Sequence, residues 1–170
     1  MAALKASKQG WACVGHKLDY AHRAWIQPGH WLTSDMQKAN EDAAALYESW
    51  KKDVQVEDRL EDAEVVLTAY GISARICKSA VELLRAQGVK AGLIRPITVH
   101  PFPYAAYDHI DYSKVKAVLD VEMSIPAQFV DDVAVAVKDR CLIETCLCSG
   151  GNIMSRDKVL AAVKKIMEGK

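Results

Sequence analysis

The chain has 170 residues, of which 51% are hydrophobic and 26% are charged, a composition typical of a globular protein with a hydrophobic core. Its 22 basic and 22 acidic residues cancel, so charge gives no reason to expect a nucleic acid as partner. No apolar run reaches the roughly 20 residues of a membrane helix, and the first ten residues lack the apolar core of a signal peptide. We therefore expect a cytoplasmic protein that is not inserted in a membrane.

Residues 1–32 show neither a helical nor a strand period, and their histidines are too widely spaced to favour a zinc site. Large aromatic rings in so polar a stretch need a surface to pack on. We predict an arm that lies on another surface, and a sizeable exposed apolar patch around its three tryptophans, because that surface should belong to another domain. These tryptophans are Trp11, Trp25 and Trp31.

A helix is predicted to begin at Thr33 or Ser34 and to run to about Val54, because its apolar residues recur at helical spacing. The charged stretch that follows is expected to be a solvated connector. These features place a domain boundary near Glu61, with an arm and linker helix over 1–61 and an α/β domain over 62–170.

The continuous apolar run 65–70 is typical of a strand that is buried on both faces. Gly71 allows a sharp turn, Ser73 is a candidate N-cap, and a helix should follow and end at Gly88. The next strand is expected over 90–99, with Pro96 marking its end or an edge.

A third strand is predicted over 115–123, followed by a helix capped by Ser124 with Pro126 in its first turn. A fourth strand over 141–148 and a last helix capped by Ser155 complete the pattern. Strands that alternate with helices predict right-handed crossovers and a mostly parallel sheet with helices on both faces.

Ligands of such sheets bind outside the carboxyl ends of the strands. The turn at Gly71 has one glycine where a dinucleotide site needs three, although the helix start at Ser73 could attract an anion. Glu122, at the end of an apolar strand, is a general acid or base with a raised pKa, or a carboxylate that caps backbone N–H groups or bridges a subunit interface. The five cysteines show neither a disulfide framework nor an iron–sulfur motif, so we expect reduced thiols. The residues reveal no catalytic set and no metal site.

Six motifs follow one another along the chain: AYG (69–71), RPIT (95–98), PFP (101–103), VEM (121–123), Ala127-Gln128 and GGNI (150–153). In this order and spacing they resemble the C-terminal domain of a 2-oxoacid:ferredoxin oxidoreductase subunit. This is the subunit that carries the pyrimidine-side thiamine-diphosphate domain. The resemblance covers nearly the whole chain, and the branched-chain (2-oxoisovalerate) and 2-oxoglutarate types are the most similar. One departure is Ile125-Pro126-Ala127, where the family tends to have Met-Gly before Gln128.

The resemblance implies a three-layer α/β/α domain like the transketolase C-terminal domain, with a mostly parallel five-stranded sheet and a role in assembly. The parent complex would oxidatively decarboxylate a 2-oxoacid to an acyl-CoA and reduce ferredoxin. It would use thiamine diphosphate, Mg²⁺ and iron–sulfur clusters held by other domains and by thiamine-binding and ferredoxin-like subunits. No catalytic, cofactor or metal-binding residue is carried over to this chain, which alone should be inactive.

The candidate interface or structural residues are Gly71, Ser73, Arg95, Pro96, Glu122, Gln128, Trp11, Trp25 and Trp31. Two alternatives stay open: a free-standing ligand-binding or regulatory α/β module, and the C-terminal part of a 2-oxoacid dehydrogenase component. Whether the chain forms a homo-oligomer is also open.

Overall fold

The computed structural model describes residues 32–169. Helix α1 (Thr33–Trp50) contains no buried residue and continues into a short 3₁₀ helix, η2 (Lys51–Asp53). Ion pairs between side chains one turn apart, such as Lys38 with Asp42 at 3.0 Å, support α1 along its exposed surface. The compact unit that contains the sheet begins at Leu46, before the expected boundary near Glu61.

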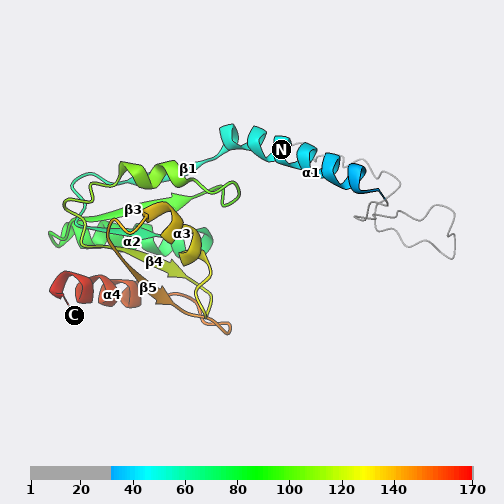
Figure 1. Ribbon diagram of the computed structural model, residues 1–170. Coiled ribbons are helices and arrows are strands. Elements are labelled where there is room, and N and C mark those ends of the chain that lie inside the picture. The colour runs from blue at the N-terminus through cyan, green and yellow to red at the C-terminus, as the bar shows by residue number, and fades with distance from the viewer. Residues whose placement is uncertain (1–31, 170) are drawn as a thin grey trace, which may run out of the picture. The chain divides into compact units, whose positions relative to one another are not determined.

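The centre of this unit is a five-stranded sheet in the order β1-β3-β2-β4-β5 (Figure 1). Strands β2, β3, β4 and β5 are parallel, and β1 pairs antiparallel with β3. The mostly parallel five-stranded sheet predicted from the sequence is thereby confirmed. The strands are β1 (Val56–Arg59), β2 (Val65–Thr68), β3 (Ala91–Pro96), β4 (Ala117–Glu122) and β5 (Leu142–Leu147).

Helices cover both faces of the sheet (Figure 1). On one face α2 (Gly71–Ala86) and α4 (Arg156–Glu168) pack on side chains such as Leu67 and Leu119. On the other face α3 (Phe129–Val137) and the 3₁₀ helix η3 (Tyr104–His109) pack on side chains such as Val66 and Val118. Successive strand residues alternate between these two cores, as the pleat requires.

Strand β1 corrects the prediction of a solvated connector after the first helix. Its sequence, VEDR, carries three charged side chains, and Glu57 among them forms ion pairs at the surface. Glu57 binds Lys78 at 2.5 Å and Arg95 at 3.1 Å, and these two cations hold its pKa below the usual value. A charged strand of this kind suits the edge of a sheet, where it discourages pairing with other chains.

Two predicted helix starts are also corrected. Helix α2 begins at Gly71, so Ser73 lies inside the helix, buried, and is not its N-cap. Helix α3 begins at Phe129, so Ser124 and Pro126 lie in the preceding loop, where the peptide bond before Pro126 is cis. The predicted cap of α4 is confirmed, because the Ser155 hydroxyl accepts the N–H of Lys158 at 3.2 Å.

A buried carboxylate pair near the carboxyl edge of the sheet

Two carboxylates lie at the end of β4, on the face of the sheet that α3 and η3 cover. Asp120 and Glu122 alternate with Val121, which belongs to the opposite core, so both acidic side chains point to the same face. Both residues are 0% exposed. Acidic side chains are rarely fully buried unless they have partners, so each needs a physical account.

Glu122 has its partners at the start of the next helix. Its carboxylate accepts the N–H of Gln128 at 2.8 Å and the N–H of Phe129 at 3.1 Å, and the hydroxyl of Ser124 also donates to it. Burial works to raise the pKa of Glu122, but these donors outweigh it, and the pKa lies below its usual value. The capping role expected for Glu122 is therefore what the structure shows, with the cap supplied by a strand instead of by the residue before the helix.

Asp120 has no such donors. None of the described residues donates a hydrogen bond to either of its carboxylate oxygens. Burial, and then the hydrogen bond and the negative charge of neighbouring Glu122, raise the pKa of Asp120 to about 8. Asp120 is therefore largely protonated at neutral pH, and its O–H can donate to Glu122.

Uncharged polar groups adjoin this pair. Thr68 lies beside Asp120 in the ladder between β2 and β4, and its hydroxyl lies 2.6 Å from the hydroxyl of Tyr107. Both hydroxyl-bearing residues are 0% exposed, and burial raises the pKa of Tyr107 well above its usual value. The arrangement can hold a proton and fix α3, but it presents no group to a bound substrate, because all four side chains are covered.

The sequence pointed to Glu122 and missed Asp120. The signal was present, since Asp120 interrupts an apolar strand and lies two residues before Glu122, which places both on one face. The sequence alone does not show that, among the described residues, no cation acts on either carboxylate.

The other predicted residues that the structure describes lie apart from this pair or support it through the backbone. Gly71 turns the chain into α2 at φ +55°, the left-handed region that glycine tolerates best. Arg95 is half-buried and pairs with Glu57, and Pro96 ends β3 opposite Val56. Gln128 precedes α3 and contributes its backbone N–H to Glu122. Their role in an interface stays a prediction.

The tryptophans Trp11, Trp25 and Trp31, with the patch predicted around them, lie outside the described residues. Of the cysteines that are described, Cys77, Cys146 and Cys148 are buried and free. Burial raises the pKa of Cys77 to about 12, so its thiol stays protonated. Across residues 32–169 no three His, Cys, Asp or Glu side chains are grouped so that they could hold a metal ion.

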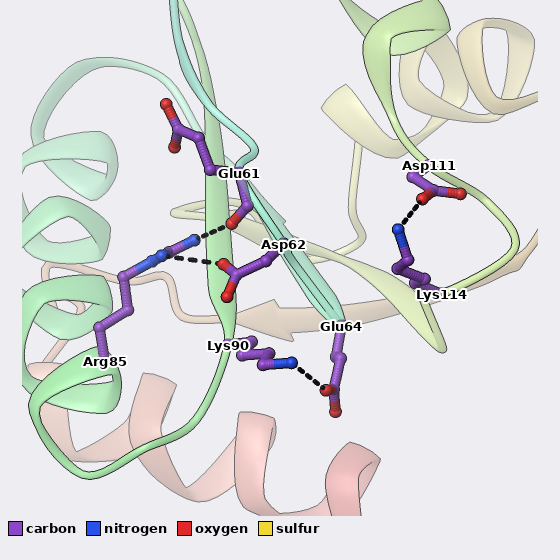
Figure 2. A network of polar contacts seen from close by, with 7 residues as sticks. All are labelled: Glu61, Asp62, Glu64, Arg85, Lys90, Asp111 and Lys114. Atoms are coloured by element: carbon purple, nitrogen blue, oxygen red, sulfur yellow. Dashed lines mark hydrogen bonds and ion pairs between the residues drawn. The ribbon is translucent and has the colours of Figure 1, made fainter.

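A separate polar network lies at the opposite, amino-terminal edge of the parallel strands (Figure 2). At the end of α2, Arg85 donates to the carbonyl of Glu61 at 2.6 Å and to the carboxylate of Asp62 at 3.1 Å. Its Nε also donates to the carbonyl of Ala91 at 2.6 Å. Arg85 therefore joins the helix to the connector between β1 and β2 and to the start of β3, which is a structural role.

Comparison with known families assigns this fold. Residues 63–159, more than half of the chain, match the model of the pyruvate:ferredoxin oxidoreductase core domain II. The chain belongs to this family. The match includes β2, α2, β3, β4, α3 and β5, so the carboxylate pair lies inside core domain II.

Curated relatives of this core domain II are subunits of 2-oxoacid oxidoreductases. The chain is 40% identical over 107 residues to the ketoisovalerate oxidoreductase subunit VorB of Methanothermobacter marburgensis, covering 63% of this chain and 30% of the relative. It is 44% identical over 64 residues to the 2-oxoglutarate synthase subunit KorA of Methanocaldococcus jannaschii, covering 38% of this chain and 17% of that relative. The chain thus spans about a third or less of the relatives it matches.

Solved structures confirm the fold of core domain II. The 2-oxoglutarate:ferredoxin oxidoreductase of Magnetococcus marinus matches with a TM-score of 0.64 at 19% identity, over 81% of this chain and 24% of that one. A split-gene transketolase matches with a TM-score of 0.56 at 18% identity, over 67% of this chain and 41% of that one. The likeness to the transketolase C-terminal domain expected from the sequence is confirmed at the level of the fold. In the described part of the chain, no helix is long and apolar enough to cross a membrane.

Proposed function

We propose that this chain supplies core domain II to a 2-oxoacid:ferredoxin oxidoreductase that acts on a branched-chain 2-oxoacid. The observation that carries the proposal is the 40% identity to a ketoisovalerate oxidoreductase subunit over 107 residues, 63% of this chain. The whole complex would convert the 2-oxoacid and CoA to an acyl-CoA and carbon dioxide, and pass two electrons to ferredoxin in the cytoplasm. 2-Oxoglutarate is the second candidate substrate, because its synthase subunits are also among the relatives.

The role of core domain II in this complex is assembly. Both acidic residues of its sheet edge are buried, and Glu122 is bound to the start of α3, so they are not available for general acid or base catalysis. Thiamine diphosphate, Mg²⁺ and iron–sulfur clusters are expected on other domains and on the thiamine-binding and ferredoxin-like partner subunits.

The alternative of a free-standing ligand-binding module requires serine hydroxyls that can bind a ligand at the helix starts after the strands. Ser73 is 3% exposed inside α2, and the Ser124 hydroxyl is bound to Glu122. Neither is free to bind an anion at the start of a helix.

An activity assay tests the proposal on the purified chain. It is incubated with thiamine diphosphate, Mg²⁺, CoA and either 2-oxoisovalerate or 2-oxoglutarate, with methyl viologen as electron acceptor. We expect no viologen reduction above that of a protein-free control, and turnover by the chain alone would contradict an assembly role. In a parallel thermal-shift assay we expect CoA, ATP and phosphate to leave the midpoint unchanged, whereas a saturable increase would favour the ligand-binding module.

A further inference from the structure

Asp120 occupies an unusual position for an acidic residue. It lies inside the sheet, flanked by Thr68 in β2 and Thr145 in β5, and is 0% exposed. Both of its carboxylate oxygens are buried, and the described residues supply neither with a hydrogen bond. An ionised carboxylate in this position would lose its hydration and gain nothing in return.

The groups around Asp120 make ionisation still less favourable. Neighbouring β3 contributes the apolar Ile94 to this face, and α3 contributes Phe129 and Val133. Within residues 32–169, the titratable groups that act on Asp120, or on which it acts, are all acids, phenols or thiols, and none of them carries a positive charge. They are Glu122 from its own strand, Tyr70 before α2, Tyr107 from η3, Cys77 from α2 and Cys146 from β5.

Glu122, in contrast, must be ionised to accept the hydrogen bonds that hold the start of α3. It receives the N–H groups of Gln128 and Phe129 and the Ser124 hydroxyl, which are all donors. A protonated Asp120 adds one more donor on the same side of the strand. The two carboxyl groups are therefore complementary when they share one proton and repel each other when they share none.

We propose that Asp120 and Glu122 hold a single proton, carried by Asp120, and that this proton couples the attachment of α3 to pH. Glu122 binds the start of α3, and Asp120 neutralises the site without removing the charge that the helix needs. When the proton leaves Asp120 for solvent, two negative charges face each other below α3 and the loop 124–128.

The direction of the pH effect follows from the pKa of Asp120, which is raised from 3.8 to about 8. Between these two values an opened form in which Asp120 is hydrated releases the proton, whereas the closed form keeps it. The closed form therefore becomes less stable as pH rises from about 4 to about 8, and the effect levels off above pH 8.

Hydrogen exchange of the full chain, followed residue by residue by NMR, measures this coupling. After correction for the intrinsic pH dependence of amide exchange, the protection factors of amides in the first turn of α3 should fall about tenfold per pH unit between pH 5.5 and 7.5. The Asp120→Asn variant mimics the neutral acid and should show no such fall. Asp131→Asn is the matched control, because it removes an exposed carboxylate from the same helix, and it should keep the slope of the parent chain.

Carbon-13 NMR of the side-chain carboxyl groups provides a test that needs no variant. We expect Asp120 to titrate near pH 8 and Glu122 below pH 4.5. Titration of Asp120 near pH 4 would overturn the proposal, and so would protection factors that fall with pH as steeply in Asp120→Asn as in the parent chain.

Discussion

Replacing Glu122 with Gln changes the start of α3 while it preserves the size of the side chain. The carboxylate accepts two backbone N–H groups, at 2.8 and 3.1 Å, and a serine hydroxyl. A hydrogen bond to a charged group contributes about 1 kcal/mol more than a neutral one, and a negative charge at a helix N-terminus contributes about 0.5–1 kcal/mol. We therefore expect Glu122→Gln to lower the free energy of unfolding by about 2–4 kcal/mol.

Urea unfolding at pH 6, followed by circular dichroism at 222 nm, measures this loss in the full chain. For a chain of this size the corresponding decrease in Tm is about 4–16 °C. Glu144→Gln is the matched control, because Glu144 is an exposed carboxylate in β5, and it should change the free energy of unfolding by less than about 0.5 kcal/mol. If Glu122→Gln were no more destabilising than Glu144→Gln, the capping account would be wrong.

The pH dependence of the same variant provides a second check. The pKa of Glu122 lies below its ordinary value of 4.5, so its contribution to stability is present above pH 4.5 and is lost as pH falls through the folded-state pKa. The parent chain should lose stability more steeply than Glu122→Gln does in this acidic range. Parallel acid profiles would show that Glu122 does not stabilise the fold through its charge.

Three further substitutions test the fold itself, each by urea unfolding. Gly71→Val places a β-branched residue at φ +55° and should cost about 1–3 kcal/mol; a change below about 0.5 kcal/mol would show that the turn adapts. Gly92→Ala puts a methyl group 3.0 Å from both the side chain of Ala63 and the carbonyl oxygen of Arg59. We expect it to lower the free energy of unfolding by about 1–3 kcal/mol. An unchanged free energy would mean that this part of the sheet moves apart easily. Arg85→Ala removes three hydrogen bonds at the amino-terminal edge of the sheet and should cost about 1–2 kcal/mol, whereas Arg85→Lys should recover part of it; equal losses would show that the planar geometry of the guanidinium is essential.

The parallel part of the sheet could be predicted because its signals are local. The apolar run 65–70, the glycine at 71 and the helical spacing that follows belong to one continuous stretch, and they gave β2 and α2 to within a few residues. Strand β5 and helix α4 followed from the same kind of pattern, with Ser155 as a cap next to the helix it serves.

Strand β1 and the start of helix α3 are predicted wrongly because each depends on a contact between residues that are not neighbours in the sequence. Strand β1 has a charged sequence that resembles a connector, and only its pairing with β3 and the ion pairs of Glu57 make it a strand. The local pattern at Ser124 predicts a start of α3 that is too early, because the cap is the side chain of Glu122 on the preceding strand.

The burial of Asp120 could not be predicted for a related reason. A polar residue in a strand suggests a solvent-facing position, and only the packing of α3 and η3 over this face encloses it. Glu122 is recognisable from its place at the end of the strand. The relation between the two acids depends on the side chains that act on them, and among the described residues none of these is a cation.

Isolation of the chain from the cells that encode it tests the central claim most directly. The tagged full chain is purified under anaerobic conditions, and the proteins that co-purify with it are assayed for 2-oxoacid-dependent reduction of methyl viologen and, separately, of NAD⁺. We predict CoA-dependent viologen reduction with 2-oxoisovalerate, more slowly with 2-oxoglutarate, and no reduction of NAD⁺. NAD⁺ reduction would indicate a 2-oxoacid dehydrogenase instead, and a chain that co-purifies with no 2-oxoacid-oxidising activity would contradict the proposed role of core domain II.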